Sequence, residues 1–217
     1  MKTVVVFDLD GTLVDSEDFI VWSFVKAGEL VGVEVDPEVI RSSIGMPLEL
    51  VVERAFLNRG VPVSLVKVFL EVRRKLVEEH WRSRVSLYPD VIPVLRVLRD
   101  MGLILAVASS SVTKRIVDFL SYFGVLEYFH VVSGVNGGTR GKPEPDVILE
   151  ALKSVGRGAE EAVYVGDREV DCVAATRAHV DFVLIDRRGV FSEQRFACRP
   201  VGVIRSLLEL PLLVKRL

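Results

Sequence analysis

Two aspartates stand one residue apart near the start of the chain, in the stretch DLDGT at residues 8–12. Residues 3–7, directly before them, form a continuous apolar and β-branched run, which predicts a strand buried on both faces. Two carboxylates at the end of a buried strand are costly to desolvate unless they are paired or bind a metal ion. We therefore interpret this stretch as the centre of a polar site.

A solvated turn and a calcium-binding loop are two other interpretations of this stretch. Asp and Gly are ordinary turn residues, so a solvated turn would use the same types; here Gly11 permits the sharp bend and Thr12 can hold it with a hydrogen bond. A calcium-binding loop fits less well, because it needs a third oxygen-bearing residue before the glycine and a glutamate at its end. In this chain Gly11 follows Asp10 directly.

Polar side chains also follow three later segments that are expected to be buried strands. They are Ser109 after residues 103–108, Lys142 in the loop after residues 128–132, and Asp167 with Asp171 after residues 162–165. Open parallel sheets place their sites at the carboxyl ends of the strands. We expect all of these side chains, together with Asp8 and Asp10, to meet at one edge of a sheet.

A group of three or four carboxylates requires a cation, and ligation by Asp oxygens alone favours Mg²⁺. Lys142, the Ser109 hydroxyl and the backbone N–H groups of the turn after Asp8 are suited to hold a phosphoryl group. One carboxylate of the pair can attack phosphorus while the other transfers protons. We assign Asp8 as the nucleophile and Asp10 as the general acid and base.

The elements that must position these residues alternate between strands and helices. Strands are expected at residues 181–186 and 201–204 as well, with helices at 90–101, 112–123 and 146–155. This alternation predicts an α/β fold, a doubly wound parallel sheet with right-handed crossovers.

Residues 16–84 show helical spacing and no strand pattern, which predicts an all-helical domain inserted after the first strand. The core domain would then consist of residues 1–15 and 85–217. The last helix of the insert, at residues 64–82, is expected to carry a basic outer face that contains Arg73, Arg74 and Lys75.

Together, the DLDGT stretch, Ser109, Lys142 in GKPEPD and the GDREVD stretch from residue 166 resemble the haloacid dehalogenase superfamily, in the order that the family shows them. The resemblance implies a Rossmann-like core and a helical cap that closes over the site. It implies that Ser109 and Lys142, with the turn at Gly11 and Thr12, bind phosphate. It also implies a metal site made by Asp8, the backbone carbonyl of Asp10, Asp167 and Asp171.

Residue types favour one branch of this family. The dehalogenases carry an aromatic residue and the phosphonate-cleaving enzymes an alanine where this chain has Asp10. β-Phosphoglucomutases share the serine run and helical cap, but usually have an arginine shortly after the glycine of the cap loop, where Gly45 is followed here by Met46. The chain looks most like phosphoglycolate-phosphatase-type members. We expect an Mg²⁺-dependent phosphatase for a small phosphorylated metabolite, with phosphoglycolate as one candidate.

Two alternatives stay open at this point: a sugar phosphomutase of the β-phosphoglucomutase type, and a non-catalytic module that binds phosphate or metal. Residues that select the substrate are expected in the cap, at Arg41, at Gly45 or at Arg54. An arginine there would suit a substrate that carries a carboxylate.

Composition narrows the partners. The 217 residues carry a net charge of −2, which gives no electrostatic reason to bind nucleic acid or a membrane surface. Cys172 and Cys198, the two cysteines, indicate no disulfide framework and no metal site, so a reduced cytoplasmic setting is expected. A monomer or a homodimer is compatible with the sequence.

Overall fold

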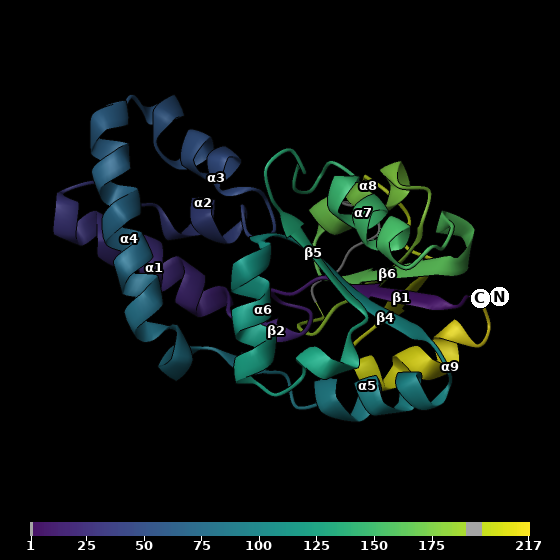
Figure 1. Cartoon of the computed structure of the whole chain (residues 1–217). Coiled ribbons are helices and arrows are strands. Elements are labelled where there is room, and N and C mark those ends of the chain that lie inside the picture. Colours follow the sequence, from purple (N-terminus) through teal and green to yellow (C-terminus); the bar gives the residue numbers. More distant parts are fainter. Residues whose placement is uncertain (1, 190–196) are drawn as a thin grey trace.

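The centre of the molecule is a six-stranded parallel sheet in the order β5-β4-β1-β6-β7-β8 (Figure 1). The computed structural model describes residues 2–189 and 197–217. The strands are β1 (Val4–Phe7), β4 (Ile104–Val112), β5 (Val131–Val135), β6 (Ala162–Gly166), β7 (Asp181–Ile185) and β8 (Gly202–Ile204). The predicted doubly wound α/β fold is confirmed, with β1 in the middle of the sheet.

Helices cover both faces of this sheet. One face packs against α5 (Val91–Asp100), α6 (Thr113–Tyr122) and α9 (Leu210–Val214), and the other against α7 (Asp146–Ser154) and α8 (Glu169–Arg177). Alternate side chains of β1 enter the two apolar cores, and all four of its residues are fully buried. Burial on both sides explains why residues 3–7 are apolar without alternation.

Four helices lie together beside the sheet and form the cap (Figure 1). They are α1 (Glu17–Val31), α2 (Pro37–Arg41), α3 (Leu48–Ala55) and α4 (Val63–Arg84). Their inner side chains, among them Phe24, Phe56 and Phe69, make an apolar core separate from the two that flank the sheet. The helices fall within the segment expected to be the insert, and its exact boundaries at residues 16 and 84 stay a prediction.

A two-stranded antiparallel pair joins the two stretches that connect core and cap. In it β2 (Val14–Asp15) pairs with β3 (Ser86–Leu87). The sequence did not predict this pair, because strands of two residues show no alternation that could be recognised. The third strand of the sheet was also misplaced: residues 126–128 form a 3₁₀ turn, and β5 begins only at Val131.

The expectation that the two cysteines make no cross-link is wrong. Cys172 in α8 forms a disulfide bond with Cys198, and their Cα atoms lie 6.1 Å apart. The chain returns to α8 at this point, where the N–H of Ala197 donates to the Glu169 carboxylate at 2.8 Å. A separation of 26 residues in sequence gave no sign of this approach. Within the described ranges, no helix has the length and apolar character needed to cross a bilayer.

Candidate active site

Three carboxylates gather at the carboxyl edge of the sheet, where neighbouring strands β1 and β6 end. Asp8 follows β1, Asp167 follows β6, and Asp171 lies in the first turn of α8. One oxygen from each lies within 4.8 Å of the other two. We call these residues the acid cluster. The structure thus brings together three of the four residues predicted to bind a metal through the sheet edge.

Lys142 supplies the one ammonium group inside this cluster. Its Nζ lies 2.5 Å from Asp8 Oδ1 and 2.5 Å from Asp171 Oδ1, and the side chain has no exposed surface. The backbone N–H of Lys142 donates to Ser110 Oγ at 2.9 Å, which ties the loop after β5 to the end of β4. Arg168 also pairs with Asp167, at 3.0 Å, but it is shared with Glu17, so the three carboxylates keep a surplus of negative charge.

The pKa values of these carboxylates show that their negative charge is not fully compensated. Burial raises the pKa of Asp8 well above its ordinary value, against the attraction of Lys142 and with repulsion from Asp171 and Asp167. Burial, with repulsion from Asp171, raises the pKa of Asp167 to about 7. Apart from the ion pair with Lys142, the oxygens of Asp8 accept no hydrogen bond from the described residues. Buried carboxylate oxygens with this deficit fit a hard divalent cation, so the cluster could hold a metal ion.

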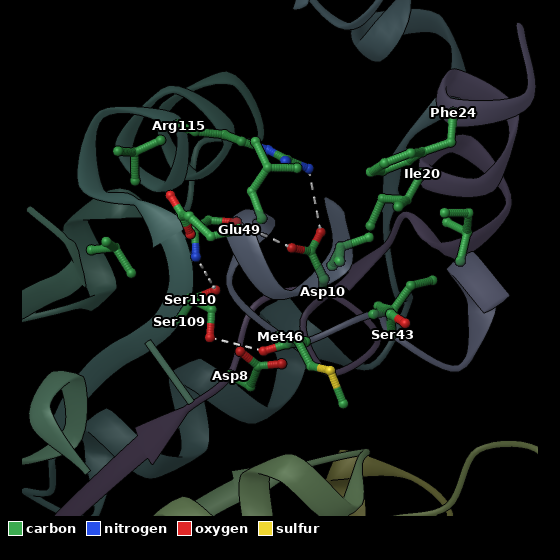
Figure 2. A pocket seen from close by; sticks show the side chains of 18 of the residues that line it. Asp8, Asp10, Ile20, Phe24, Ser43, Met46, Glu49, Ser109, Ser110 and Arg115 are labelled. Atoms are coloured by element: carbon green, nitrogen blue, oxygen red, sulfur yellow. Dashed lines mark hydrogen bonds and ion pairs between the residues drawn. The ribbon is translucent and has the colours of Figure 1, made fainter. Parts of the chain in front are cut away.

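Asp10 turns away from the acid cluster, toward the cap. Its carboxylate accepts hydrogen bonds from Ser16 Oγ at 2.6 Å and Ser111 Oγ at 3.4 Å. The Nη2 atom of Arg115 lies 3.7 Å from Asp10 Oδ1 (Figure 2). The turn therefore separates its two carboxylates, one beside the possible metal site and the other at the cavity below the cap.

Gly11 and Thr12 shape this turn. Gly11 has a φ of +84°, and a Cβ at this position would lie 2.3 Å from Asp167 Oδ2, so only glycine fits. Its N–H donates to the carbonyl of Val14, while Thr12 Oγ1 lies 3.5 Å from Asp167 Oδ1. In the described part of the chain, the N–H groups of Leu9 and Asp10 have no protein acceptor. These two amides, rather than that of Gly11, are placed to meet an anion.

A cavity of about 270 Å³ lies between the core and the cap (Figure 2). The core contributes Asp8, Asp10, Ser109 and Arg115, and the cap contributes Ile20, Phe24, Gly45, Met46 and Arg73. Ser109 is buried, and its Oγ accepts a hydrogen bond from the N–H of Ser111 at 3.2 Å. The cavity is thus lined by three of the residues predicted for phosphoryl chemistry, Asp8, Asp10 and Ser109, and by residues of both domains.

The residues predicted to select the substrate lie in different places. Gly45 lines the cavity, whereas Arg41 and Arg54 do not. The guanidinium group of Arg54 reaches Met46 Sδ at 3.5 Å, at the surface.

Arg41 belongs to a second charged cluster, around the carboxylate of Glu17 at the start of α1. Glu17 pairs with Arg41 of the cap, with Arg168 at 2.5 Å and with Arg188 at 2.9 Å. Burial alone would raise the pKa of Glu17, but the hydrogen bond from Arg41 and the charges of Arg168 and Arg188 lower it below its ordinary value. We call these four residues the Glu17 cluster. It joins the cap to two loops of the core.

Two cavity arginines were missed. Arg115 was not considered, and the expectation that Arg73 lies on an outer basic face is wrong, because Arg73 lines the cavity. The signal was present in the helical spacing: Val66, Phe69, Arg73 and Val77 follow one another at intervals of three or four residues. Arg73 therefore lies on the apolar stripe of α4 and faces inward.

Comparison with known proteins agrees with this geometry. Residues 5–185 match the family model described as haloacid dehalogenase-like hydrolase. A phosphoglycolate phosphatase from Aquifex aeolicus is 32% identical over 179 residues, which cover 81% of this chain and 80% of that protein. The pyrophosphatase PpaX from Halalkalibacterium halodurans is 28% identical over 210 residues, covering 95% and 94% of the two chains.

A solved structure shows the same fold over nearly the whole length. It is a protein from Bacteroides fragilis assigned to the haloacid dehalogenase-like hydrolases, with a TM-score of 0.86 and 28% identity, covering 97% of this chain and 100% of that one. The family match spans both the strand with Asp8 and the loop with Asp167. The chain therefore belongs to the haloacid dehalogenase-like hydrolases, and it is a phosphatase.

Proposed function

We propose that this chain is an Mg²⁺-dependent phosphatase that transfers the phosphoryl group of a small phosphorylated metabolite first to Asp8 and then to water. One observation carries the proposal: the buried carboxylate of Asp8 lies beside Lys142 and two other carboxylates, while Asp10 faces the cavity. Attack and proton transfer would thus be assigned to two side chains with different surroundings.

Asp8, Asp167 and Asp171, with the backbone carbonyl of Asp10, would hold the cation. When bound, Mg²⁺ would neutralise charge on the phosphoryl oxygens and on Asp8, which otherwise repel one another. Ser109 and the N–H groups of Leu9 and Asp10 would hold the oxygens that take no part in bond breaking. Lys142 would keep the Asp8 carboxylate in place and add positive charge beside it.

In the first step, an oxygen of Asp8 forms a bond to phosphorus while the bond from phosphorus to the leaving oxygen breaks. Asp10 donates its proton to that oxygen, so the product leaves as a neutral hydroxyl. In the second step, the Asp10 carboxylate removes a proton from water as the water oxygen attacks phosphorus. This step releases phosphate and restores Asp8 as a carboxylate and Asp10 as an acid.

The experiment measures phosphate release from p-nitrophenyl phosphate and a panel of phosphorylated metabolites, with Mg²⁺ and with a chelator. We expect turnover only with Mg²⁺. A borohydride quench during turnover should reduce the acyl phosphate on Asp8 to homoserine, which mass spectrometry detects as a change confined to that residue. The Asp8→Asn variant is the control and should show neither turnover nor this product.

Three results would contradict the proposal. A metal-loaded protein that hydrolyses nothing would favour a binding module, and phosphate moved between positions of a sugar would identify a phosphomutase. Turnover without any trapped Asp8 would exclude the covalent route.

A further inference from the structure

Two guanidinium groups approach the same cavity from opposite domains. Arg73 comes from α4 of the cap, and Arg115 comes from α6 of the core. The Nε of Arg73 donates to Ser23 Oγ at 3.1 Å, and its Cζ lies 4.0 Å from the centre of the Phe24 ring. The Cζ of Arg115 lies 5.0 Å from the centre of the Phe119 ring. Aromatic rings thus hold both guanidinium groups in place, and in the part of the chain that the structure describes the remaining N–H donors of these groups stay free to bind a ligand.

These two arginines lack carboxylate partners of their own. Among the described residues, Arg73 forms no ion pair, and the buried Nε of Arg115 has no hydrogen-bond acceptor. The nearest carboxylate is Asp10, and its distance of 3.7 Å from Arg115 is too long for a direct hydrogen bond. Glu49, the remaining acid that lines the cavity above Asp8 and Asp10, lies on an exposed turn of α3 at the rim.

Four other arginines near the site behave differently, and of these Arg188 is exposed while the other three are partly buried. Arg41, Arg168 and Arg188 all pair with Glu17. Arg187 forms two hydrogen bonds with the Asp90 carboxylate, at 2.9 and 3.0 Å. Each of these four arginines therefore pairs with a carboxylate at 3.0 Å or less, whereas in the cavity Arg115 has only the 3.7 Å contact with Asp10 and Arg73 has no ion pair among the described residues.

The charge of Arg73 persists at neutral pH. Burial and repulsion from Arg115 lower its pKa to about 9, although Asp10 partly offsets them. At pH 7 both guanidinium groups are therefore charged, and the carboxyl group nearest to them is that of Asp10, which the proposed mechanism already uses for proton transfer. Asp8 pairs with Lys142, and Glu49 is exposed at the rim. Of the described acidic residues, only Asp10 is therefore close to the two guanidinium groups inside the cavity. The part of the cavity beside them therefore favours an anion.

We propose that Arg73 and Arg115 bind a second anionic group on the substrate. This group belongs to the leaving group, whose oxygen Asp10 protonates. The inference rests on the proposed function and adds the substrate class: a small phosphate ester or anhydride with a carboxylate or a second phosphate close to the scissile oxygen. Guanidinium groups bind either oxyanion through paired hydrogen bonds. The cavity volume of about 270 Å³ lies below the usual range for drug-sized ligands, which favours a small leaving group.

The test compares substrates of matched size. 2-Phosphoglycolate is paired with 2-hydroxyethyl phosphate, which has a neutral hydroxyl in place of the carboxylate, and pyrophosphate is paired with acetyl phosphate, an anhydride with a neutral acetyl group in place of the second phosphate. The wild-type protein should prefer the anionic member of at least one pair by on the order of 100-fold in kcat/KM. The first pair reports on a carboxylate and the second on a phosphate.

Arg73→Gln and Arg115→Gln should each reduce this preference by roughly 10-fold to 100-fold, mainly through KM. Using the ratio within a pair cancels any general loss of activity. Arg74→Gln is the matched control, because Arg74 is the exposed neighbour of Arg73 and pairs with Glu78 at the surface. It should leave the preference unchanged.

A second measurement separates this inference from the proposed function. In an Asp8→Asn background, the equilibrium Kd of 2-phosphoglycolate and of pyrophosphate is measured by calorimetry, and adding Arg73→Gln or Arg115→Gln should raise it about 10-fold for the preferred ligand. If the Kd rises in the arginine variants but the wild-type protein shows no turnover, the phosphatase mechanism is refuted and the arginine site is upheld. No preference for anionic substrates, or equal preference and equal Kd in all variants, would overturn the inference.

Discussion

The acid cluster and the Glu17 cluster are neighbours in the structure, because Asp167 of the first and Arg168 of the second are adjacent in sequence. Their charges are unbalanced in opposite directions. The acid cluster places three carboxylates around Lys142, whereas the Glu17 cluster places three guanidinium groups around one carboxylate. Arg168 connects the two, since it pairs with Asp167 at 3.0 Å and with Glu17 at 2.5 Å. Both clusters are rich in charge, and the carboxylates of both are largely buried, so neither feature distinguishes them.

The pKa shifts distinguish them. The pKa values of Asp8 and Asp167 are raised because burial and repulsion between the carboxylates exceed the attraction of Lys142 and, for Asp167, also that of Arg168. The pKa of Glu17 is lowered because its three arginines more than offset burial. The first cluster keeps negative charge that an added cation could offset, whereas in the second the arginines offset the charge of Glu17 and hold α1 against α2 and two core loops. A site for a ligand is thus indicated by missing charge rather than by charge itself.

Removal of one carboxylate from the acid cluster should have the largest effect. In Asp8→Asn we expect activity to fall by on the order of 10³-fold or more, since the attacking group is lost. The free energy of unfolding without Mg²⁺ should rise by on the order of 1 kcal/mol, because repulsion falls while Lys142 keeps Asp171 as its partner. Denaturant unfolding in chelator measures this, and exposed Asp100→Asn is the control. A less stable metal-free variant would refute the surplus of negative charge.

The same change of charge in the Glu17 cluster should act in the opposite direction. Glu17→Gln leaves Arg188 without its carboxylate and weakens the hold on Arg41 and Arg168, so we expect a loss of about 1–3 kcal/mol in unfolding free energy. Asp18→Asn is the neighbouring control, because Asp18 is exposed, and it should cost less than about 0.5 kcal/mol. If the two variants lose equal stability, the Glu17 cluster is not a structural joint.

The raised pKa of Asp167 makes metal binding depend on pH. Protons compete with the cation at a carboxylate whose pKa is about 7, so the apparent Kd for Mg²⁺ should rise up to about tenfold per pH unit below pH 7 and level off above it. Without metal, the raised pKa makes folding less favourable as pH increases from about 4 to about 7. Calorimetric titration at pH 6 and pH 8 tests the binding, and equal affinities would contradict it.

The smallest expected effect is on the free energy of unfolding at low pH. A lowered pKa at Glu17 stabilises the fold above the ordinary value of 4.5, and this contribution is lost as pH falls through the lower folded-state pKa. The stability difference between wild type and Glu17→Gln should therefore be constant at neutral pH and shrink below about pH 4. Unfolding curves at pH 3 to 7 measure it, and a difference that grows in acid would be inconsistent with the ion pairs.

The sheet and the residues at its carboxyl edge could be predicted from the sequence. Each strand is recognisable from its own residues, and parallel strands bring their carboxyl ends together. The apolar run before Asp8 and the one before Asp167 each ended in acids, and parallel strands bring such ends together. The helical insert was equally clear from its spacing. Both predictions rely on patterns that span many residues.

What the sequence did not reveal depends on contacts between distant segments. Arg73 and Arg115 share a cavity only because the cap folds over the core, and Cys172 meets Cys198 only because the chain returns to α8. Arg54 was favoured because an arginine suits a carboxylate-bearing substrate, and the residue type says nothing about the direction of its side chain. The β2–β3 pair was too short to show a pattern.

The central claim is that a divalent cation completes the acid cluster, and anomalous diffraction from crystals soaked in Mn²⁺ tests it most directly. The account predicts one strong peak within coordination distance of Asp8, Asp167 and Asp171, and no peak beside Glu17. A peak elsewhere, or none at the acid cluster under conditions that support turnover, would contradict the account.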